Sequence, residues 1–205
     1  MDISNKGILL VLSGPAGSGK GTIVKNILER DSMIRLSVSA TTRAPRPGEI
    51  DGVHYSFVSS QKFEEMIASD EMLEHTRYCG NYYGTPREHV NKMLESGISV
   101  ILEIELEGAM NIRRLCPDAV LVLLLPPDFK TLENRLRGRH TNTEDDIKSR
   151  LERARTEVSF FDKYDYVVIN EDNMYEKAAT TVLNILDSER HRTSRNQSIP
   201  TDFFG

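Results

Sequence analysis

Apolar positions gather in four short runs along the chain, and each run is too short for a helix and rich in branched side chains. The runs cover residues 8–12, 100–102, 120–125 and 166–169. A continuous apolar run of this length predicts a strand that is buried on both faces, as in a parallel sheet with helices on either side.

Stretches with a helical spacing of apolar residues lie between or after these runs, at 19–30, 87–94, 129–136 and 174–189. Alternating strands and helices are typical of a parallel sheet covered by helices. The sequence therefore predicts the α/β class, with a three-layer core.

Two segments interrupt this alternation. Residues 39–88 are dense in Thr, Tyr, Gly and Pro, and we expect an inserted subdomain of short antiparallel strands there. Residues 135–155 are strongly charged and have little to bury, which favours a mobile flap. Residues 191–205 are polar apart from Phe203 and Phe204, so a flexible tail is expected.

The 205 residues are 39% hydrophobic, which is enough to bury a sizeable core in one unit. We expect a single domain over residues 1–205. Its expected parts are a core of 1–38, 89–129 and 158–190, an insertion at 39–88, a lid at 130–157 and a tail at 191–205.

The charge balance argues against a protein built mainly to neutralise nucleic-acid phosphates, because 26 Lys and Arg face 31 Asp and Glu, a formal net charge of −5. No apolar run approaches the roughly 20 residues that span a bilayer, and the first residues lack the features of a signal peptide. We expect a cytoplasmic protein without a nucleic-acid or membrane partner. Cys79 and Cys116 form no CxxC pair, so reduced thiols are favoured and a single bridge stays open.

A glycine-rich segment with the spacing G-x-x-x-x-G-K follows the first predicted strand and precedes a predicted helix. Its members are Gly14, Pro15, Ala16, Gly17, Ser18, Gly19, Lys20, Gly21 and Thr22. Glycines let backbone N–H groups converge on phosphate oxygens, and Lys20 can reach the terminal phosphates. A turn that binds nothing is the alternative, but it explains neither Lys20 nor the strand before the loop.

Gly21 stands where many such loops carry the Ser or Thr that holds Mg²⁺. We expect Thr22 to contact phosphate instead, and the metal to be held largely through water and the nucleotides. The loop predicts binding of a nucleoside triphosphate, a property that motors, GTPases and kinases share.

Three motifs in the rest of the chain narrow this class. SVSATTRAPR at 37–46, GNYYGT at 80–85 and LEIELEGA at 102–109, with further motifs in order over about 7–186, closely resemble the guanylate kinase family. The resemblance implies transfer of the γ-phosphoryl group of ATP to GMP, with Mg²⁺ as cofactor, giving ADP and GDP. It also implies that the insertion binds GMP and that the lid moves.

The residues that the resemblance assigns to GMP are Ser39, Arg43, Arg46, Tyr55, Glu74, Tyr83, Gly84, Thr85 and Glu103. Arg43 and Arg46 lie three apart in a loop rich in Pro and Thr, where two guanidinium groups would clamp a monophosphate. Tyr55 and Tyr83 would add neutral donors. Either arginine alone would be interpreted as a solvated surface residue.

Glu74, with the hydroxyls of Ser39 and Thr85, is expected to select the base. Guanine offers two adjacent donors, whereas adenine offers an acceptor where guanine has its ring N–H, so a carboxylate matches only guanine. The alternative for Glu74 is an exposed glutamate on a strand.

Glu103 and Glu105 alternate with apolar residues at the end of a predicted buried strand. Unpaired charge is costly there, so both side chains should face the site. Glu103 is expected to bond the guanine or to orient Arg43, and Glu105 to hold water on Mg²⁺. Glu107 is interpreted as a solvated residue in the first turn of a helix.

Four cations are expected to act in the transfer: Lys20, Arg135, Arg139 and Arg150. Negative charge spreads over donor and acceptor oxygens during phosphoryl transfer, and arginines that arrive when a flap closes stabilise that charge and exclude water.

A functional role is less well supported for three other residues near the flap. Arg137 and Arg153 are expected in surface salt bridges with glutamates of the same segment, namely Glu133, Glu144 and Glu152. Asn170 resembles a residue that contacts the adenine of ATP, and a turn-forming asparagine is an equal alternative.

Two other functions stay open. A guanylate-kinase-like scaffold module binds a partner peptide without catalysis, but such modules generally have a degraded P-loop, and the loop and its arginines are intact here. A P-loop kinase for another small phosphate acceptor would keep the loop and the flap, yet it gives no reason for Glu74 beside 80–85.

Overall fold

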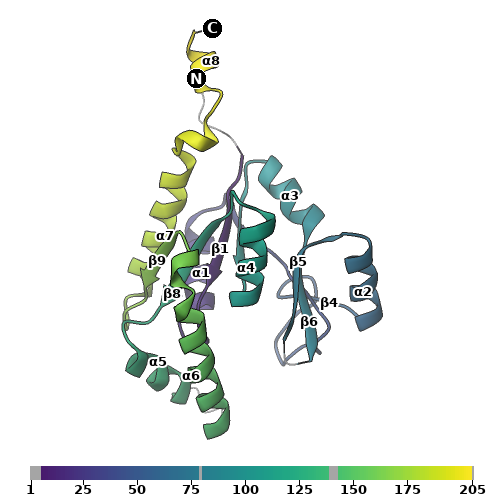
Figure 1. Ribbon diagram of the computed structural model, residues 1–205, viewed down its shortest axis with the longest axis vertical. Helices are drawn as coiled ribbons and strands as arrows, with labels where there is room; N and C mark the ends of the chain where they lie inside the picture. Colours follow the sequence, from purple (N-terminus) through teal and green to yellow (C-terminus); the bar gives the residue numbers. More distant parts are fainter. Residues whose placement is uncertain (1–5, 79, 139–142, 205) are drawn as a thin grey trace.

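The chain folds around a five-stranded parallel sheet, in a computed structural model that describes residues 6–78, 80–138 and 143–204 (Figure 1). The strand order is β2-β7-β1-β8-β9. The strands are β1 (Leu9–Ser13), β2 (Ile34–Leu36), β7 (Ser99–Glu103), β8 (Val120–Leu125) and β9 (Tyr166–Ile169). The four predicted strands are confirmed, but the expected burial on both faces is wrong for β9, an edge strand in which Val167 and Ile169 are exposed. Strand β2 was missed because it has three residues, of which only Ile34 is buried.

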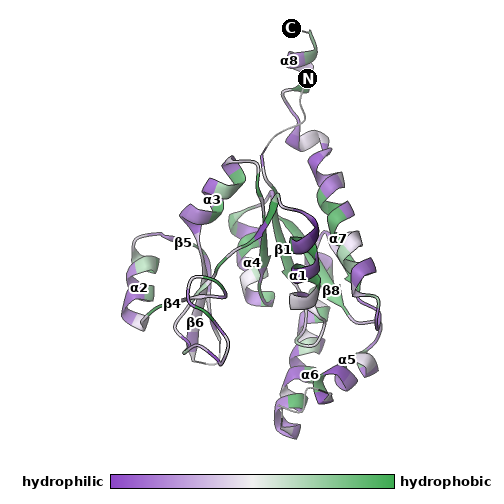
Figure 2. Ribbon diagram, turned by 180° about the vertical axis from the view of Figure 1, so that it is seen from behind, coloured by the Kyte–Doolittle hydropathy of each residue, from purple (hydrophilic) through white to green (hydrophobic). Residues whose placement is uncertain are grey.

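Helices cover both faces of this sheet, α1 (Lys20–Arg30) and α7 (Tyr175–Arg190) on one face and α3 (Arg87–Glu95) and α4 (Leu106–Leu115) on the other. Successive residues of β1 show why. Leu10 and Leu12 pack in the cluster that contains Ile23 of α1, whereas Leu9 and Val11 pack in the cluster that contains Ile112 of α4. Strand β1 is thus apolar on both faces, and Figure 2 shows mostly hydrophobic central strands between helices of mixed hydropathy. The three-layer α/β core is confirmed.

The insertion forms a second, four-stranded sheet in the order β4-β3-β6-β5. Its strands are β3 (Ala40–Thr41), β4 (Ser56–Phe57), β5 (Met72–Tyr78) and β6 (Asn81–Pro86). The antiparallel expectation is correct for β5 with β6 and for β6 with β3, but wrong for β3 with β4, which pair in parallel. The fourteen-residue loop between β3 and β4 gives the chain room to return in the same direction.

The insertion also contains a helix that the sequence analysis missed, α2 (Ser60–Ala68). The side chain of Ser59 caps it by accepting from the backbone N–H of Lys62 at 3.1 Å. Phe63, fully buried, stacks on Tyr82 with ring centres 5.1 Å apart. One buried aromatic residue therefore fixes this helix on the small sheet.

The charged segment expected to be a flap is mostly helical, with α5 (Phe129–Arg137) and α6 (Glu144–Ser159) joined to β9 by a short 3₁₀ turn, η1 (Phe161–Lys163). Thr143 and Asp146 form a capping box that starts α6. The expectation that residues 135–155 have little to bury is wrong, because Leu136, Ile147 and Ala154 are buried, and Leu136 and Ala154 form a small apolar cluster with Leu132. Its mobility stays a prediction.

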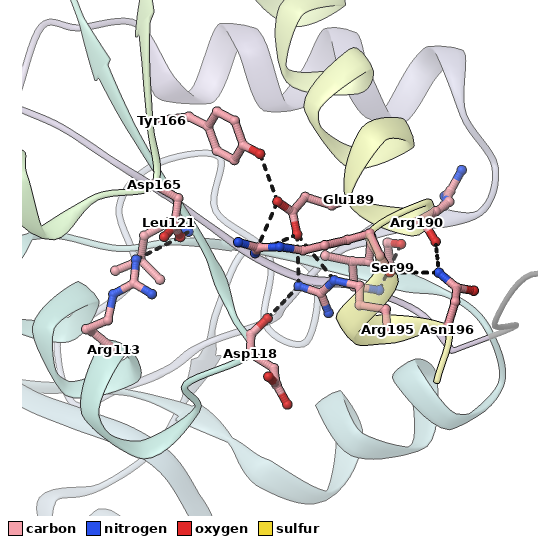
Figure 3. Close-up of polar contacts among 12 residues, drawn as sticks. Ser99, Arg113, Asp118, Leu121, Asp165, Tyr166, Glu189, Arg190, Arg195 and Asn196 are labelled. Carbon is pink, nitrogen blue, oxygen red and sulfur yellow. Dashed lines mark hydrogen bonds and ion pairs between the residues drawn. The ribbon is translucent and has the colours of Figure 1, made fainter. Parts of the chain in front are cut away.

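The segment after α7 has secondary structure of its own and contacts the core at its start, and the flexibility expected for 191–205 stays a prediction. A 3₁₀ turn, η2 (Thr193–Arg195), precedes a short helix, α8 (Ile199–Phe204). The Arg195 guanidinium donates to the Glu189 carboxylate at 3.2 Å and to the Asp118 carbonyl at 2.7 Å, and the Tyr166 hydroxyl donates to Glu189 at 2.8 Å (Figure 3). Only α8 extends away from the core, at the end opposite α6 (Figure 1).

None of the helices in the described part of the chain is long and apolar enough to cross a membrane.

Glu189 is 3% exposed and holds the tail through charged hydrogen bonds. Replacing it with Ala leaves Arg195 and Tyr166 without this acceptor, so we expect a loss of about 2 kcal/mol or more and a thermal midpoint lower by roughly 4–8 °C. The measurement is thermal melting together with limited proteolysis of the tail. Asp187→Ala, an exposed change two residues away, is the control. Equal midpoints and cleavage rates for the two variants would contradict this account of the tail.

Candidate active site

The glycine-rich loop lies at the carboxyl end of β1, where close backbone contacts require glycine. Gly14 has φ +146°, and a Cβ there would lie 2.1 Å from the carbonyl oxygen of Leu124 in β8. Gly19 has φ +96°, and a Cβ there would lie 2.4 Å from the side-chain nitrogen of Asn170. The loop therefore keeps its shape only because these positions lack side chains.

Lys20, the first residue of α1, lies against the loop. Its ammonium donates to the carbonyl of Gly14 and, at 3.4 Å, to that of Pro15. Asn170, at the end of β9, is 5% exposed and donates from its amide to the carbonyl of Ser18 at 2.8 Å. Asn170 thus braces the phosphate loop, and its expected contact with adenine stays a prediction.

Arg135, near the end of α5, lies beside the same loop. It donates to the carbonyl of Asn170 at 2.8 Å and forms an ion pair with Asp172 at 2.6 Å. Its other terminal nitrogen is 3.5 Å from the carbonyl oxygen of Ser18. A cation is therefore placed next to the loop, although α5 is far from it in sequence.

The prediction for Arg137 is confirmed, because it pairs with Glu133 and Glu144 on the surface. Arg139, expected to be catalytic, lies outside the described residues, as do His140 and Cys79.

A pocket of about 620 Å³ separates the small sheet from the carboxyl end of β7 and the start of α4. It brings together eight of the nine residues expected to bind GMP: Ser39, Arg43, Arg46, Tyr55, Glu74, Tyr83, Gly84 and Glu103. Arg150 of α6 and Glu105 also line it. Four further lining residues, Thr76, Ile104, Glu107 and Gly108, were missed. The signal for Thr76 was available, since it lies two residues from Glu74 and so on the same face of β5.

Arg43 is held in place by a carboxylate that the sequence analysis left without a role, Glu49. The two terminal nitrogens of Arg43 donate to the two oxygens of Glu49 at 2.8 and 2.9 Å. Glu49 also accepts from the backbone N–H of Arg46 at 2.7 Å. The hydrogen bonds from Arg43 and Arg46 lower the pKa of Glu49 to about 2. Glu49, and not Glu103, therefore orients Arg43.

The guanidinium of Arg43 also lies over two aromatic rings, with its central carbon 5.3 Å from the ring centre of Tyr55 and 5.6 Å from that of Phe57. The Glu49 hydrogen bonds, with a smaller contribution from Tyr83, raise the pKa of Arg43 further above its usual value. The signal for Glu49 was its opposite charge six residues from Arg43 in one Pro- and Gly-containing loop.

Glu74 is 4% exposed, so the alternative of an exposed glutamate is wrong. Its Oε1 accepts from the hydroxyl of Thr85 at 2.9 Å, which places Thr85 behind the carboxylate and not on the pocket wall. Its Oε2 is buried and has no hydrogen-bond partner among the described residues. Burial raises the pKa of Glu74 to about 7, against a smaller lowering by Thr85. The pocket thus contains one prepared, incompletely satisfied acceptor.

The glutamates at the end of β7 and just after it lie in two different environments, one mostly buried and one ion-paired. Burial raises the pKa of Glu103, and the nearby ammonium of Lys20 opposes that shift. Glu105 and Glu107 both pair with Arg153 of α6, at 2.6 and 2.9 Å.

Arg153 also pairs with Glu157 at 3.1 Å. The ion pairs described for Arg153 are thus with Glu105, Glu107 and Glu157, which were not expected. The fold brings the start of α4 next to α6, so that carboxylates distant in sequence reach Arg153. Glu107 does lie in the first turn of a helix, as expected, but it is ion-paired.

A parallel sheet with a glycine-rich phosphate loop after its first strand, and a basic helix beside that loop, defines a P-loop nucleotide-binding protein. The comparisons with known proteins are more specific. A family model described as "Guanylate kinase" matches residues 6–189.

Two curated relatives are the guanylate kinases of Clostridioides difficile strain 630, 46% identical over 97% of this chain and 96% of the relative, and of Latilactobacillus sakei subsp. sakei strain 23K, 47% identical over 94% and 95%. The crystal structure of guanylate kinase from Anaplasma phagocytophilum covers 97% of this chain and 94% of its own, with a TM-score of 0.79 at 32% identity. The chain belongs to the guanylate kinase family. It is an ATP:GMP phosphotransferase, which phosphorylates GMP using ATP.

The raised pKa of Glu74 makes stability depend on pH with a defined sign. Its ordinary value is 4.5 and its folded value about 7, so between these limits the folded chain keeps a proton that the unfolded chain has lost. Stability from this group is therefore lost as pH rises through that window. Glu74→Gln removes the dependence and keeps an acceptor for Thr85. We expect the variant to melt higher than the native chain at about pH 8, and the gain to shrink toward about pH 4. Melting curves across this range test it, and a difference that does not change with pH would contradict it.

Proposed function

We propose that GMP binds in the pocket between the small sheet and α4, and that ATP bound on the phosphate loop transfers its γ-phosphoryl group to it. One observation carries this assignment: the buried Glu74 carboxylate, with an unsatisfied oxygen, shares a pocket with Arg43. An acceptor for a base and a cation for a phosphate are thus available to one nucleotide. We place this reaction in the cytoplasm, in purine nucleotide metabolism, since its substrates are free nucleotides.

Glu74 reads the base in this proposal. The ionised carboxylate accepts from both donors on the edge of guanine, and Thr85 fixes its rotamer by donating to Oε1. Ser39 and Glu103, which also line the pocket, complete the contacts to the base. Adenine would place an acceptor against the carboxylate and leave a buried charge unpaired.

Arg43 and Arg46 clamp the GMP phosphate, with Tyr55 and Tyr83 as neutral donors. Glu49 holds the Arg43 guanidinium before any ligand arrives, so little side-chain freedom is lost on binding. The GMP phosphate carries its charge before and during the reaction. These contacts therefore serve binding more than turnover.

The loop from Gly14 to Thr22 cradles the phosphates of ATP with its backbone N–H groups and the positive end of α1. Lys20 exchanges the carbonyl of Gly14 for a phosphate oxygen. Asn170 lies at the loop, where the adenine end of ATP would also be within its reach.

Arg135, Arg139 and Arg150 stabilise the charge that develops during the transfer. Arg135 lies on the ATP side, beside the phosphate loop, and Arg150 lines the GMP pocket from α6. Arg135 therefore acts from the side of ATP, and Arg150 acts from the side of GMP. Closure of the lid at 130–157 would bring them nearer and exclude water.

Mg²⁺ is typical of this family and fits the residues at the loop. Glu103 supplies a hard oxygen donor beside Gly21, where a Cβ would lie 3.9 Å from its Oε1. No group of three or more His, Cys, Asp or Glu in the described part of the chain is arranged to hold a metal ion. We therefore assign Glu103 and Glu105 to waters on an ion that the phosphates of ATP hold. When bound, Mg²⁺ neutralises charge on the phosphate oxygens.

Selectivity for guanine tests this function. ADP release is measured with GMP, AMP, CMP and UMP, for the native chain and for Glu74→Gln. GMP should be the best acceptor for the native chain. In the variant kcat/KM for GMP should fall by about tenfold or more, about 1.4 kcal/mol, because a donor replaces one acceptor, whereas AMP should lose less or gain.

If AMP or a pyrimidine nucleotide gave faster ADP release than GMP, the assignment of GMP as the acceptor would be wrong. If folded protein released no ADP with any of the four acceptors, a scaffold module would be favoured. An unchanged ratio of GMP to AMP in Glu74→Gln would place base reading elsewhere in the pocket.

The arginines separate by role in steady-state kinetics. Arg43→Ala should raise KM for GMP by roughly 10–100-fold with a smaller effect on kcat, because it contacts charge that is present before the reaction. Arg150→Ala should lower kcat by about 100-fold with a smaller effect on KM. Arg137→Ala, which removes only surface ion pairs, is the control and should stay within about twofold. If Arg43→Ala left KM for GMP unchanged, the clamp would be misplaced.

A further inference from the structure

Gly108 is an exception to the helix preferences of the chain. It is the third residue of α4, is buried, and lies on the wall of the GMP pocket. Its φ is not positive, so any residue could adopt its backbone conformation. Alanine is the best helix former and glycine among the poorest. The helix by itself therefore gives no reason for glycine here.

The surroundings of Gly108 supply the reason. A Cβ at this position would lie 3.1 Å from Oε2 of Glu74, and its next neighbour would be the side chain of Ile104 at 3.2 Å. Oε2 is the buried oxygen that has no partner among the described residues. The missing side chain thus faces a pocket acceptor that has no hydrogen-bond partner among the described residues.

Gly84 provides the contrast, because it too lies beside Glu74. A Cβ there would lie 2.9 Å from the backbone oxygen of Glu74 and 3.0 Å from the ring of Phe63. Gly84 is therefore required by the packing of the small sheet. The contacts at Gly108 are with side chains only, and α4 is joined to β5 elsewhere, through Asn111, which donates to the carbonyl of His75 at 3.1 Å.

We propose that Gly108 is a specificity-determining residue, whose missing Cβ keeps Oε2 of Glu74 open to the donors of guanine. A methyl group here would push the carboxylate by a few tenths of an ångström, or cover the oxygen, and either change weakens the bonds that distinguish guanine from adenine. The inference rests on the proposed role of Glu74 in reading the base.

Gly108→Ala tests the proposal by separating binding from stability. We expect kcat/KM for GMP to fall roughly tenfold, mainly through KM, since small misplacements at a site have effects of this size. AMP should lose less, so the ratio of GMP to AMP should shrink, and KM for ATP should not change. The thermal midpoint should hold or rise by roughly 2–4 °C, because alanine favours the helix. Arg114→Ala, exposed on the same helix, is the control for both readouts.

A second variant tests the contact itself. Asp is one methylene shorter than Glu, so Glu74→Asp withdraws the carboxylate from a Cβ at position 108. In that background Gly108→Ala should cost less than about threefold in kcat/KM for GMP, which a double-mutant cycle reports as coupling.

Three results would overturn the proposal: an unchanged KM for GMP in Gly108→Ala, equal losses for GMP and AMP, or a midpoint as low as that of Gly84→Ala, which we expect to be strongly destabilised. The last result would mean that the fold excludes the Cβ. If Glu74→Gln shrinks the ratio of GMP to AMP and Gly108→Ala does not, only this inference fails. If neither does, the proposed reading of the base fails as well.

Discussion

The close passage of the phosphate loop over the ends of the parallel strands is the constraint on which the rest of the site depends. Gly14 lies so near the carbonyl of Leu124 that no side chain fits, and Gly17 lies under Leu132 and Leu136 of α5. Strand β1, strand β8 and α5 are therefore fixed relative to one another by close contacts with these glycines. Asn170, from β9, closes the arrangement by donating to Ser18. Phosphate and cations can then meet in one place.

The acceptor pocket is prepared at some cost in stability. Glu74 is buried with one oxygen unsatisfied, and its raised pKa records the penalty. Arg43 is the opposite case, because its guanidinium already donates two hydrogen bonds to Glu49 before the ligand arrives. In the proposed function, the base is therefore recognised by a group that gains its partner on binding, and the phosphate by a group that is already oriented. In this proposal Glu74 provides the selectivity for the base, and Arg43 binds the phosphate with little reorganisation.

Helix α6 connects these two sites. Its Arg150 lines the GMP pocket, while its Arg153 holds Glu105 and Glu107 at the start of α4. Its Ala154 packs with α5, whose Arg135 lies beside the phosphate loop. A helix whose surface is mostly charged is therefore positioned by ion pairs and a small apolar cluster. Such contacts are weaker than a continuous core, which suits a segment that is proposed to move.

The sequence by itself determined the α/β core, the phosphate loop and the family, because apolar runs, glycine spacing and local motifs are short-range signals. Its motifs also identified most of the residues of the insertion that line the pocket. Tertiary structure alone decided which charges meet. Arg153 pairs with Glu105, Glu107 and Glu157 only because α4 lies under α6, and Glu189 holds the tail only because Asp118 and Tyr166 are near it. Helix α2, strand β2 and the parallel pairing of β3 with β4 were beyond reach for the same reason: short elements are fixed by long-range packing, which periodicity does not report.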